Sequence, residues 1–304
     1  MFVSMGAALW GTETLWRVFL NKQFVSDVVV LYEHGYCCLV ALPFLWLFRE
    51  ALQGIKARVW LFLLGSAVLG SAVGTFFFTE SLRTVNLSVA NVLLNIQPLF
   101  AAFFARVLLK EQFGPGFFRW AFVAITGGAL LSLKTLSLEG LSLSGELWMV
   151  LISALCWSFG TVAGRVVNTG MSFWVASPLR LLFGLIAMIA LVCINGHASV
   201  AFLKPDVFQH WQIHQDFLLL SVFAGVLPLF LYFRGLRDTP ASLASFCEMA
   251  QILAALIVTW GYFGESLSLT QILGALILCL AVARINQIQS DPNTLLSQSV
   301  NPKD

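Results

Sequence analysis

Ten stretches of mainly apolar residues, each long enough to cross a lipid bilayer, follow one another along this chain of 304 residues. A bilayer core of about 30 Å requires about 20 such residues in an α-helix. The stretches cover residues 2–20, 25–48, 58–79, 84–108, 115–133, 145–167, 172–194, 215–235, 239–262 and 268–286. They are continuous runs, whereas the strands of a membrane barrel alternate in hydrophobicity over about ten residues. The sequence therefore predicts an all-α integral membrane protein with ten transmembrane helices.

The composition excludes a water-soluble protein. Hydrophobic residues make up 59% of the chain and charged residues only 11%. A soluble domain contains about 25% charged residues and could not cover its surface with so few. The net charge of +2, without a basic run, excludes a nucleic-acid partner. The first stretch lacks the basic region that opens a signal peptide, so we expect it to be kept as a helix.

Lysine and arginine are distributed unevenly between the two ends of the predicted helices. Ten spans place both termini on one side, and the cytoplasmic side carries the excess of basic residues. The side of the termini carries Arg49, Lys56, Arg58, Arg106, Lys110, Arg119, Arg165, Arg234, Arg237, Arg284 and Lys303, and the opposite side Arg17, Lys22, Arg83, Lys134 and Lys204. We therefore expect a multi-pass protein of the cell (inner) membrane with both termini in the cytoplasm and a disordered tail over 287–304.

An internal repeat divides the chain into halves. Residues 81–113 align with residues 235–267 at an offset of 154 without a gap, and an offset of 147 relates Trp10 to Trp157. We expect the two repeats to occupy residues 1–135 and 145–286. Each half contains five predicted helices, an odd number, so the second half enters the membrane from the opposite side. Secondary transporters use such inverted repeats to open alternately to either face of the membrane.

The cores of the two repeats read ESLRTVNLSVANVLLNIQPLFAAFFARVLLKEQF and RGLRDTPASLASFCEMAQILAALIVTWGYFGESLSLTQILGALIL. They resemble the two EamA domains of the drug/metabolite transporter superfamily. The resemblance implies a bundle of two inverted five-helix repeats that moves small metabolites or toxic compounds, often outward. Two positions depart from the pattern. Glu33 is the repeat equivalent of Arg180, at a position where the family commonly has a basic residue. Ile252 is the repeat equivalent of Pro98, which argues against a helix break in both repeats.

Charged residues inside the apolar stretches are the first candidates for a transport site, because a charge at the bilayer centre costs about 2.5–3.5 kcal/mol. These residues are Glu13, Glu33, His34, Arg180 and Glu248. We interpret Glu248 as a cavity carboxylate that binds a cationic group or takes up a proton. The alternative is a permanently protonated acid, hydrogen-bonded between helices. The amides Asn91, Asn95, Gln97 and Gln251 are expected to extend its polar lining in both halves.

Glu33 and Arg180 occupy equivalent places in the two repeats. They are expected to form an ion pair or to face one cavity together. Alternatively, Glu33 reaches water at the outer interface and Arg180 extends its charged end out of the membrane. His34 either relays a proton or fills space by hydrogen bonding.

Two tryptophans are candidates for the wall of the pathway. Trp10 and Trp157 are related by the repeat, and Glu13 follows Trp10 by one turn in a helix that the resemblance places beside the pathway. Aromatic walls at this depth suit amphipathic organic solutes. The alternative for both tryptophans is anchoring at the interface or packing.

Other motifs are interpreted as structural. Glu111 and its repeat equivalent Glu265 lie at helix ends, where they fix turns or act in gating. The glycine pairs Gly70/Gly74 and Gly160/Gly164 allow close helix packing, within the monomer or across a homodimer. His210 and His214, with Asp206 and Asp216, lack the rest of a coordination sphere, so no metal is expected. The six cysteines lie in apolar stretches and predict small core side chains.

The leading hypothesis is a secondary active transporter that exports a small organic metabolite or amphipathic drug-like solute by alternating access. Protons or a counter-solute would drive it, and its partners would be the solute and the lipid bilayer. The sequence contains no P-loop, and no cofactor is expected. One alternative is an intramembrane enzyme, although the chain lacks His-Glu-x-x-His and Gly-x-Ser-x-Gly. The other is a non-transporting structural or sensor protein, which would not need buried acids in both repeats.

Overall fold

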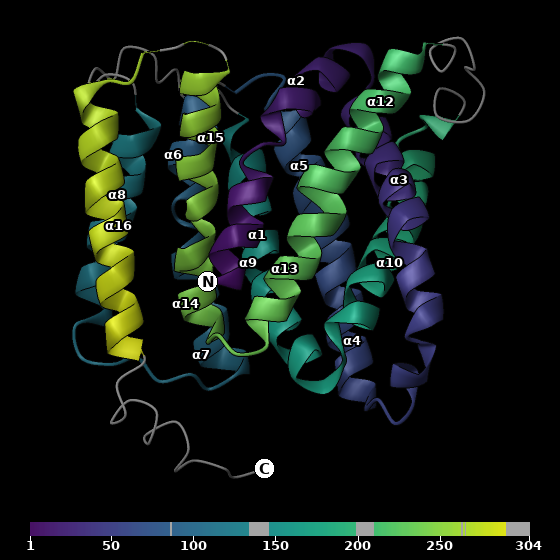
Figure 1. The fold of residues 1–304 in the computed structure, drawn as a ribbon, viewed down its shortest axis with the longest axis horizontal. Helices are drawn as coiled ribbons and strands as arrows, with labels where there is room; N and C mark the ends of the chain where they lie inside the picture. Colours follow the sequence, from purple (N-terminus) through teal and green to yellow (C-terminus); the bar gives the residue numbers. More distant parts are fainter. Residues whose placement is uncertain (86, 134–145, 199–209, 263, 265, 290–304) are drawn as a thin grey trace.

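The chain folds into one bundle of membrane-crossing helices (Figure 1). The computed structural model describes all residues except 86, 134–145, 199–209, 263, 265 and 290–304. Each of the ten predicted stretches contains either one helix or two or three consecutive helical segments. The single helices are α3 (Ser26–Leu47), α8 (Phe117–Ser132), α9 (Leu147–Gly170), α10 (Phe173–Ile194) and α16 (Leu269–Gln289). A short 3-10 helix, Arg49–Leu52, follows α3.

The other five spans are divided. The first consists of α1 (Phe2–Trp10) and α2 (Thr14–Gln23), the fourth of α6 (Leu87–Leu94) and α7 (Gln97–Leu108), and the ninth of α14 (Ala241–Glu248) and α15 (Ala250–Gly261). The third contains α4 (Ala57–Ala67), the π-helix Val68–Val73 and α5 (Gly74–Ser81), and the eighth contains α12 (Trp211–Leu220), the π-helix Ser221–Val226 and α13 (Leu227–Leu236).

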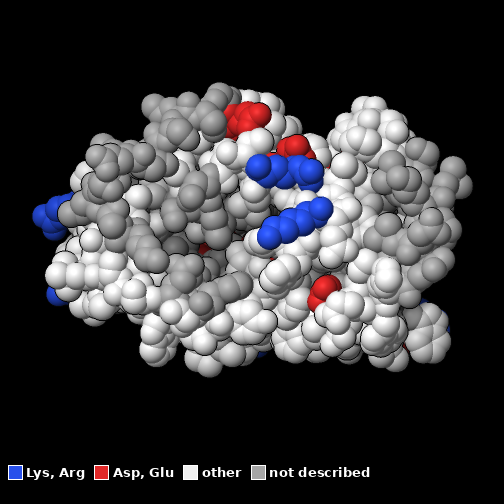
Figure 2. Space-filling model, turned by 90° about the horizontal axis from the view of Figure 1, so that it is seen from above, with Lys and Arg blue, Asp and Glu red and all other residues white. Residues whose placement is uncertain are grey.

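The lengths and surface of these helices fit a bilayer. Eight helices among the described residues are long and apolar enough to span it, and α8 is a shorter apolar helix. The divided α1–α2 span completes the ten-helix fold that the sequence predicts. Exposed side chains on the outside of the bundle include Leu39, Trp46 and Phe122, as expected where helices face hydrocarbon. Figure 2 shows the end of the bundle where α2 and α12 lie, with few charged side chains on its described surface.

The fourth and ninth spans are interrupted at equivalent positions, between α6 and α7 and between α14 and α15. In the first half the interruption lies at Asn95–Ile96 and in the second at Met249, and the offset between Asn95 and Met249 is that of the repeat. At both breaks, the backbone N–H bonds to the carbonyl three residues earlier, as in a 3-10 helix. Asn95 bonds to Val92 and Met249 to Phe246, each at 3.2 Å. Ile252 in place of a proline argues against a symmetric break, but both spans break at equivalent positions. Pro98 favours the break in the first half only, so in the second half tertiary packing maintains it.

The two halves pack crosswise. Helix α1 of the first half lies against α13, α14 and α15 of the second, while α9 of the second half lies against α4, α5 and α7 of the first. Helices α3 and α10 pair with each other at one edge of the bundle, and α8 pairs with α16 at the other (Figure 1). This arrangement encloses the central space with helices from both halves.

The structure also tests the predictions about the glycine pairs, the cysteines and the C-terminal end of the last helix. Gly70 and Gly160 bring the third span and α9 together within the monomer, because a Cβ at Gly70 would lie 2.7 Å from the Gly160 Cα. Cys193 and Cys279 are exposed, so the interpretation of all six cysteines as core residues is wrong for these two. Helix α16 continues to Gln289, beyond the predicted end at 286, and the remaining tail lies outside the described residues.

Candidate functional site

Two adjoining cavities lie between the halves of the bundle. The first has a volume of about 120 Å³ and the second about 310 Å³. They share six lining residues, which come from α1, α7, α9, α14, α15 and the break after α1: Trp10, Glu13, Gln97, Trp157, Glu248 and Gln251. The first cavity is also lined by the predicted residues Glu33, His34 and Arg180, and the second by Asn91 and Asn95. All eleven predicted site residues therefore border this central space.

Glu248 ends α14, and three side chains bond to its carboxylate. The Gln97 amide donates to Oε2 at 2.6 Å, and the hydroxyls of Thr161 and Tyr232 donate to Oε1 at 2.8 and 2.5 Å. Gln97 comes from the first half of the chain and the other two from the second. The sequence analysis did not identify Tyr232, a single tyrosine in an apolar run, or Thr161. The repeat offered a signal for Thr161, because it aligns with a second threonine, Thr14.

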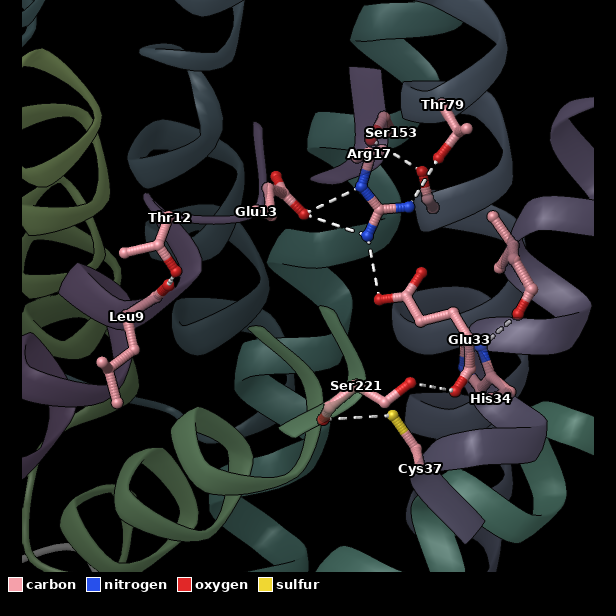
Figure 3. A network of polar contacts seen from close by, with 12 residues as sticks. Leu9, Thr12, Glu13, Arg17, Glu33, His34, Cys37, Thr79, Ser153 and Ser221 are labelled. Atoms are coloured by element: carbon pink, nitrogen blue, oxygen red, sulfur yellow. Dashed lines mark hydrogen bonds and ion pairs between the residues drawn. The ribbon is translucent and has the colours of Figure 1, made fainter. Parts of the chain in front are cut away.

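Arg17 is the cation at the centre of the first cavity's polar network, and its placement differs from the prediction (Figure 3). We expected it at an external helix end, but it is 1% exposed. Its guanidinium contacts Glu13 at 3.0 Å, Glu33 at 2.9 Å and the Thr79 hydroxyl at 3.0 Å. The break after Trp10 lets α2 turn this side chain toward α3 and α5. Buried charges require such partners, so the network accounts for three of the membrane-embedded charges at once.

The expected ion pair between Glu33 and Arg180 is absent from the described residues, since Glu33 pairs with Arg17. Arg180 instead donates to the Gly70 carbonyl at 3.1 Å, and its guanidinium lies 5.3 Å from the ring centre of Phe233. Both residues are buried and line the first cavity. The alternative in which they reach water or the membrane surface is therefore wrong, and they face one cavity.

His34 is held on both sides of its ring. Nδ1 lies 2.9 Å from the Val30 carbonyl, and Nε2 lies 2.9 Å from the Ser71 hydroxyl in the π-helix. A carbonyl oxygen can only accept, so Nδ1 carries a proton. The geometry makes His34 a hydrogen-bonded bridge between α3 and the third span.

Each of the two tryptophans at the wall of the cavities packs against an aromatic ring from the other half of the chain. The Trp10 ring lies 5.0 Å from the Tyr232 ring, and the Trp157 ring lies 5.1 Å from the Phe78 ring. Both tryptophans line both cavities. Together with the amides and carboxylates, they form a lining that can hold an aromatic ring and bond to its polar edge.

Glu111 and His214 line neither of the two central cavities. The Glu111 carboxylate accepts from the backbone N–H groups of Ala241 and Ser242 at 2.7 and 3.1 Å, and so caps α14. Glu265 and Asp206 lie outside the described residues. His214 bonds to Tyr36, and no group of three metal-binding side chains occurs in the part of the chain that the structure describes.

Comparisons with known proteins identify the family. The chain is 28% identical over 301 residues to the riboflavin transporter ImpX of Fusobacterium nucleatum subsp. nucleatum, covering 95% of this chain and 97% of that protein. It is 25% identical over 252 residues to the uncharacterized inner membrane transporter YedA of Escherichia coli K12, covering 81% and 77%. A solved crystal structure shares the fold, with a TM-score of 0.70 and 17% sequence identity over 98% of this chain and 97% of that one. The model of the EamA-like transporter family matches residues 1–133 and 143–287, so this chain belongs to that family of membrane transporters.

Proposed function

We propose that this protein is a secondary active transporter that carries a small organic solute through the central cavities by alternating access. The observation that carries the proposal is the position of these cavities, at breaks in spans from both halves of the bundle. Discontinuous helices meeting at the repeat interface form the substrate sites of many secondary transporters. The crosswise packing of α1 and α9 supports a rocking motion of one half against the other.

The proposed solute contains a planar aromatic ring. Trp10, Trp157 and Tyr232 supply aromatic rings to the lining of the first cavity, and Arg180 and Glu33 supply charged groups. The name of the relative ImpX gives riboflavin as the first compound to test, because the two chains align over nearly their whole lengths. A flavin ring is planar, and its polar edge both donates and accepts hydrogen bonds.

We further propose that transport is outward and is coupled to protons or to a counter-solute. Glu248 supports proton coupling because it is a partly buried acid that bonds to both halves of the chain. Opening of the cavity would change these partners and with them the proton affinity of the carboxylate.

Counterflow in proteoliposomes tests the proposal. Vesicles loaded with unlabelled riboflavin should accumulate labelled riboflavin transiently, and Trp157→Ala should slow this exchange severalfold. Phe122→Ala, on the lipid-facing surface, is the matched control and should not change it. Imposed gradients of pH and solute then give the coupling and the preferred direction.

Two results would contradict the proposal. If neither flavins nor other aromatic solutes exchange, the protein is not a transporter of this class. If the protein instead converts a lipid or peptide to a product without any gradient, the enzyme alternative holds.

A further inference from the structure

A third cavity lies at the end of the bundle opposite α2, where α4 begins and α7 ends (Figure 1). Its volume of about 580 Å³ exceeds that of either central cavity, and it shares no lining residue with them. Its lining comes from the start of α4, the loop after α7, the last two turns of α9 and the residue before α14. Both halves of the chain therefore contribute to it.

Three cations and one acid line this cavity: Lys56, Arg58, Arg165 and Glu111. Both oxygens of the Glu111 carboxylate already accept bonds from backbone N–H groups at the start of α14. None of the three cations forms an ion pair with a carboxylate in the part of the chain that the structure describes. The cavity therefore has two more cations than acids and favours an anion.

The three cations are held differently. Nη1 of Arg165, which is half-buried in α9, donates to the Leu236 carbonyl at the end of α13, 2.8 Å away. The Arg58 guanidinium lies 5.7 Å from the ring centre of Phe62, and Lys56 is exposed at the residue before α4. A guanidinium carries five N–H donors, so one bond leaves Arg165 with donors for a ligand. Arginine and lysine together are the usual partners of a phosphate group.

The cavity lies beside the surface that faces lipid. Helices α4 and α7 both pack against α9. Leu61 is 69% exposed and follows Arg58 by three residues, so both lie on the same face of α4. On α7, Phe103 and Val107 are 61% and 57% exposed. The cations thus adjoin apolar surface, as the headgroup of a lipid adjoins its acyl chains.

We propose that this cavity binds a phosphate group, and that the phosphate belongs to an anionic lipid whose acyl chains lie along α4 and α7. Basic pockets between transmembrane helices on the cytoplasmic side are typical sites for anionic headgroups. A bound lipid would bridge the two halves of the chain, because α4 and α7 come from the first half and α9 from the second. The site does not depend on the proposed transport function.

Native mass spectrometry of the full chain in detergent tests the site. Phosphatidylglycerol should bind severalfold more tightly than phosphatidylcholine, whose choline cation cancels the charge of its phosphate. The double variant Lys56→Gln/Arg58→Gln should weaken binding of phosphatidylglycerol at least about tenfold and leave that of phosphatidylcholine unchanged.

The double variant Arg119→Gln/Arg284→Gln is the matched control. It also removes two exposed cations at the same end of the bundle, from α8 and α16, but these line none of the three cavities. It should keep the affinity of the wild type for phosphatidylglycerol. Because all four side chains are exposed, both double variants should unfold at the midpoint of the wild type when no lipid is added.

Glycerol 3-phosphate distinguishes a lipid from a soluble source of the phosphate. Phosphatidylglycerol should raise the unfolding midpoint, whereas glycerol 3-phosphate, which lacks acyl chains, should not do so at the same concentration. If glycerol 3-phosphate raises the midpoint of the wild type but not that of Lys56→Gln/Arg58→Gln, the ligand is a soluble phosphate and the lipid is wrong.

Two results would overturn the site itself. One is equal affinity of the wild type for phosphatidylglycerol and phosphatidylcholine, with no stabilisation by glycerol 3-phosphate. The other is an equal loss of phosphatidylglycerol binding in both double variants, which would reflect the overall charge of this end of the bundle and not the cavity.

Discussion

Arg17 shows how strongly the partners of a buried charge depend on residues elsewhere in the chain. Its guanidinium lies between two carboxylates and a threonine hydroxyl, with almost no exposure. The sequence places it near the end of the first predicted stretch, where a basic residue is ordinarily at the membrane surface. The carboxylate of Glu33, 16 residues away, keeps it inside instead.

Replacing this cation should destabilise the protein. Arg17→Leu leaves the carboxylates of Glu13 and Glu33 buried without a counter-charge, which should lower the free energy of unfolding by about 3–5 kcal/mol. Thermal unfolding in detergent measures the loss. Lys22→Leu removes a charge from the exposed side of the same helix and should have little effect. Equal midpoints for Arg17→Leu and the wild type would show that the network contributes no stability.

Glu248 can be tested through the pH dependence of flux. Glu248→Gln keeps the size of the side chain and removes its titratable proton, so the part of the flux driven by a pH gradient should disappear. Counterflow at constant pH should persist, because it requires no net proton movement. Glu50→Gln changes an exposed acid in the short 3-10 helix after α3 and serves as the control. A pH-driven flux that survives in Glu248→Gln would assign coupling to another residue.

At the scale of elements, hydropathy located the spans but not their interruptions. Gly11 lies at the break of the first span, where a Cβ would overlap the backbone of Gln251, so glycine allows the end of α1 to approach α15 closely. The π-helices in the third and eighth spans have no sequence signal that we recognised. The Ser71 hydroxyl bonds to the His34 ring, and the Ser221 hydroxyl donates to the Glu33 backbone carbonyl. Both contacts exist only once α3 is packed beside these segments.

The close contact between the third span and α9 gives a prediction about stability. Gly70→Ala would place a Cβ 2.7 Å from the Gly160 Cα, so the helices must move apart, at a cost of about 1–3 kcal/mol. The equivalent change in α3, Gly35→Ala, meets nothing within 4 Å and should be neutral or stabilising by up to about 1 kcal/mol. Unfolding midpoints of the two variants should therefore move in opposite directions, or only that of Gly70→Ala should fall. A Gly70→Ala variant as stable as the wild type would contradict the packing.

At the scale of the whole molecule, the crosswise packing of α1 and α9 joins the two halves around the central cavities. The boundaries of the repeats, residues 1–135 and 145–286, stay a prediction, and so does the orientation of the termini. We propose that both termini lie in the cytoplasm, because the basic residues gather at their end of the bundle.

Labelling of single cysteines tests this orientation. In a variant without the six native cysteines, Lys22→Cys and Arg58→Cys would mark opposite ends of the bundle, at α2 and at the start of α4 (Figure 1). A membrane-impermeant maleimide added to intact cells should label position 22 and not position 58. Both positions should react after the cells are opened. The reverse pattern in intact cells would place the termini outside.

The sequence by itself determined the class of the protein, the ten spans, the family and residues that line the central cavities. Hydropathy, the spacing of the repeat and the rarity of charge within apolar stretches are properties of the chain order alone. Only the tertiary structure decided which residues pair, where spans break and that Arg17 and Arg180 line the first central cavity but not the second. The physical reason is distance along the chain: Arg17 meets Thr79 across 62 residues, and Gln97 meets Glu248 across 151, so neither contact is specified by local sequence.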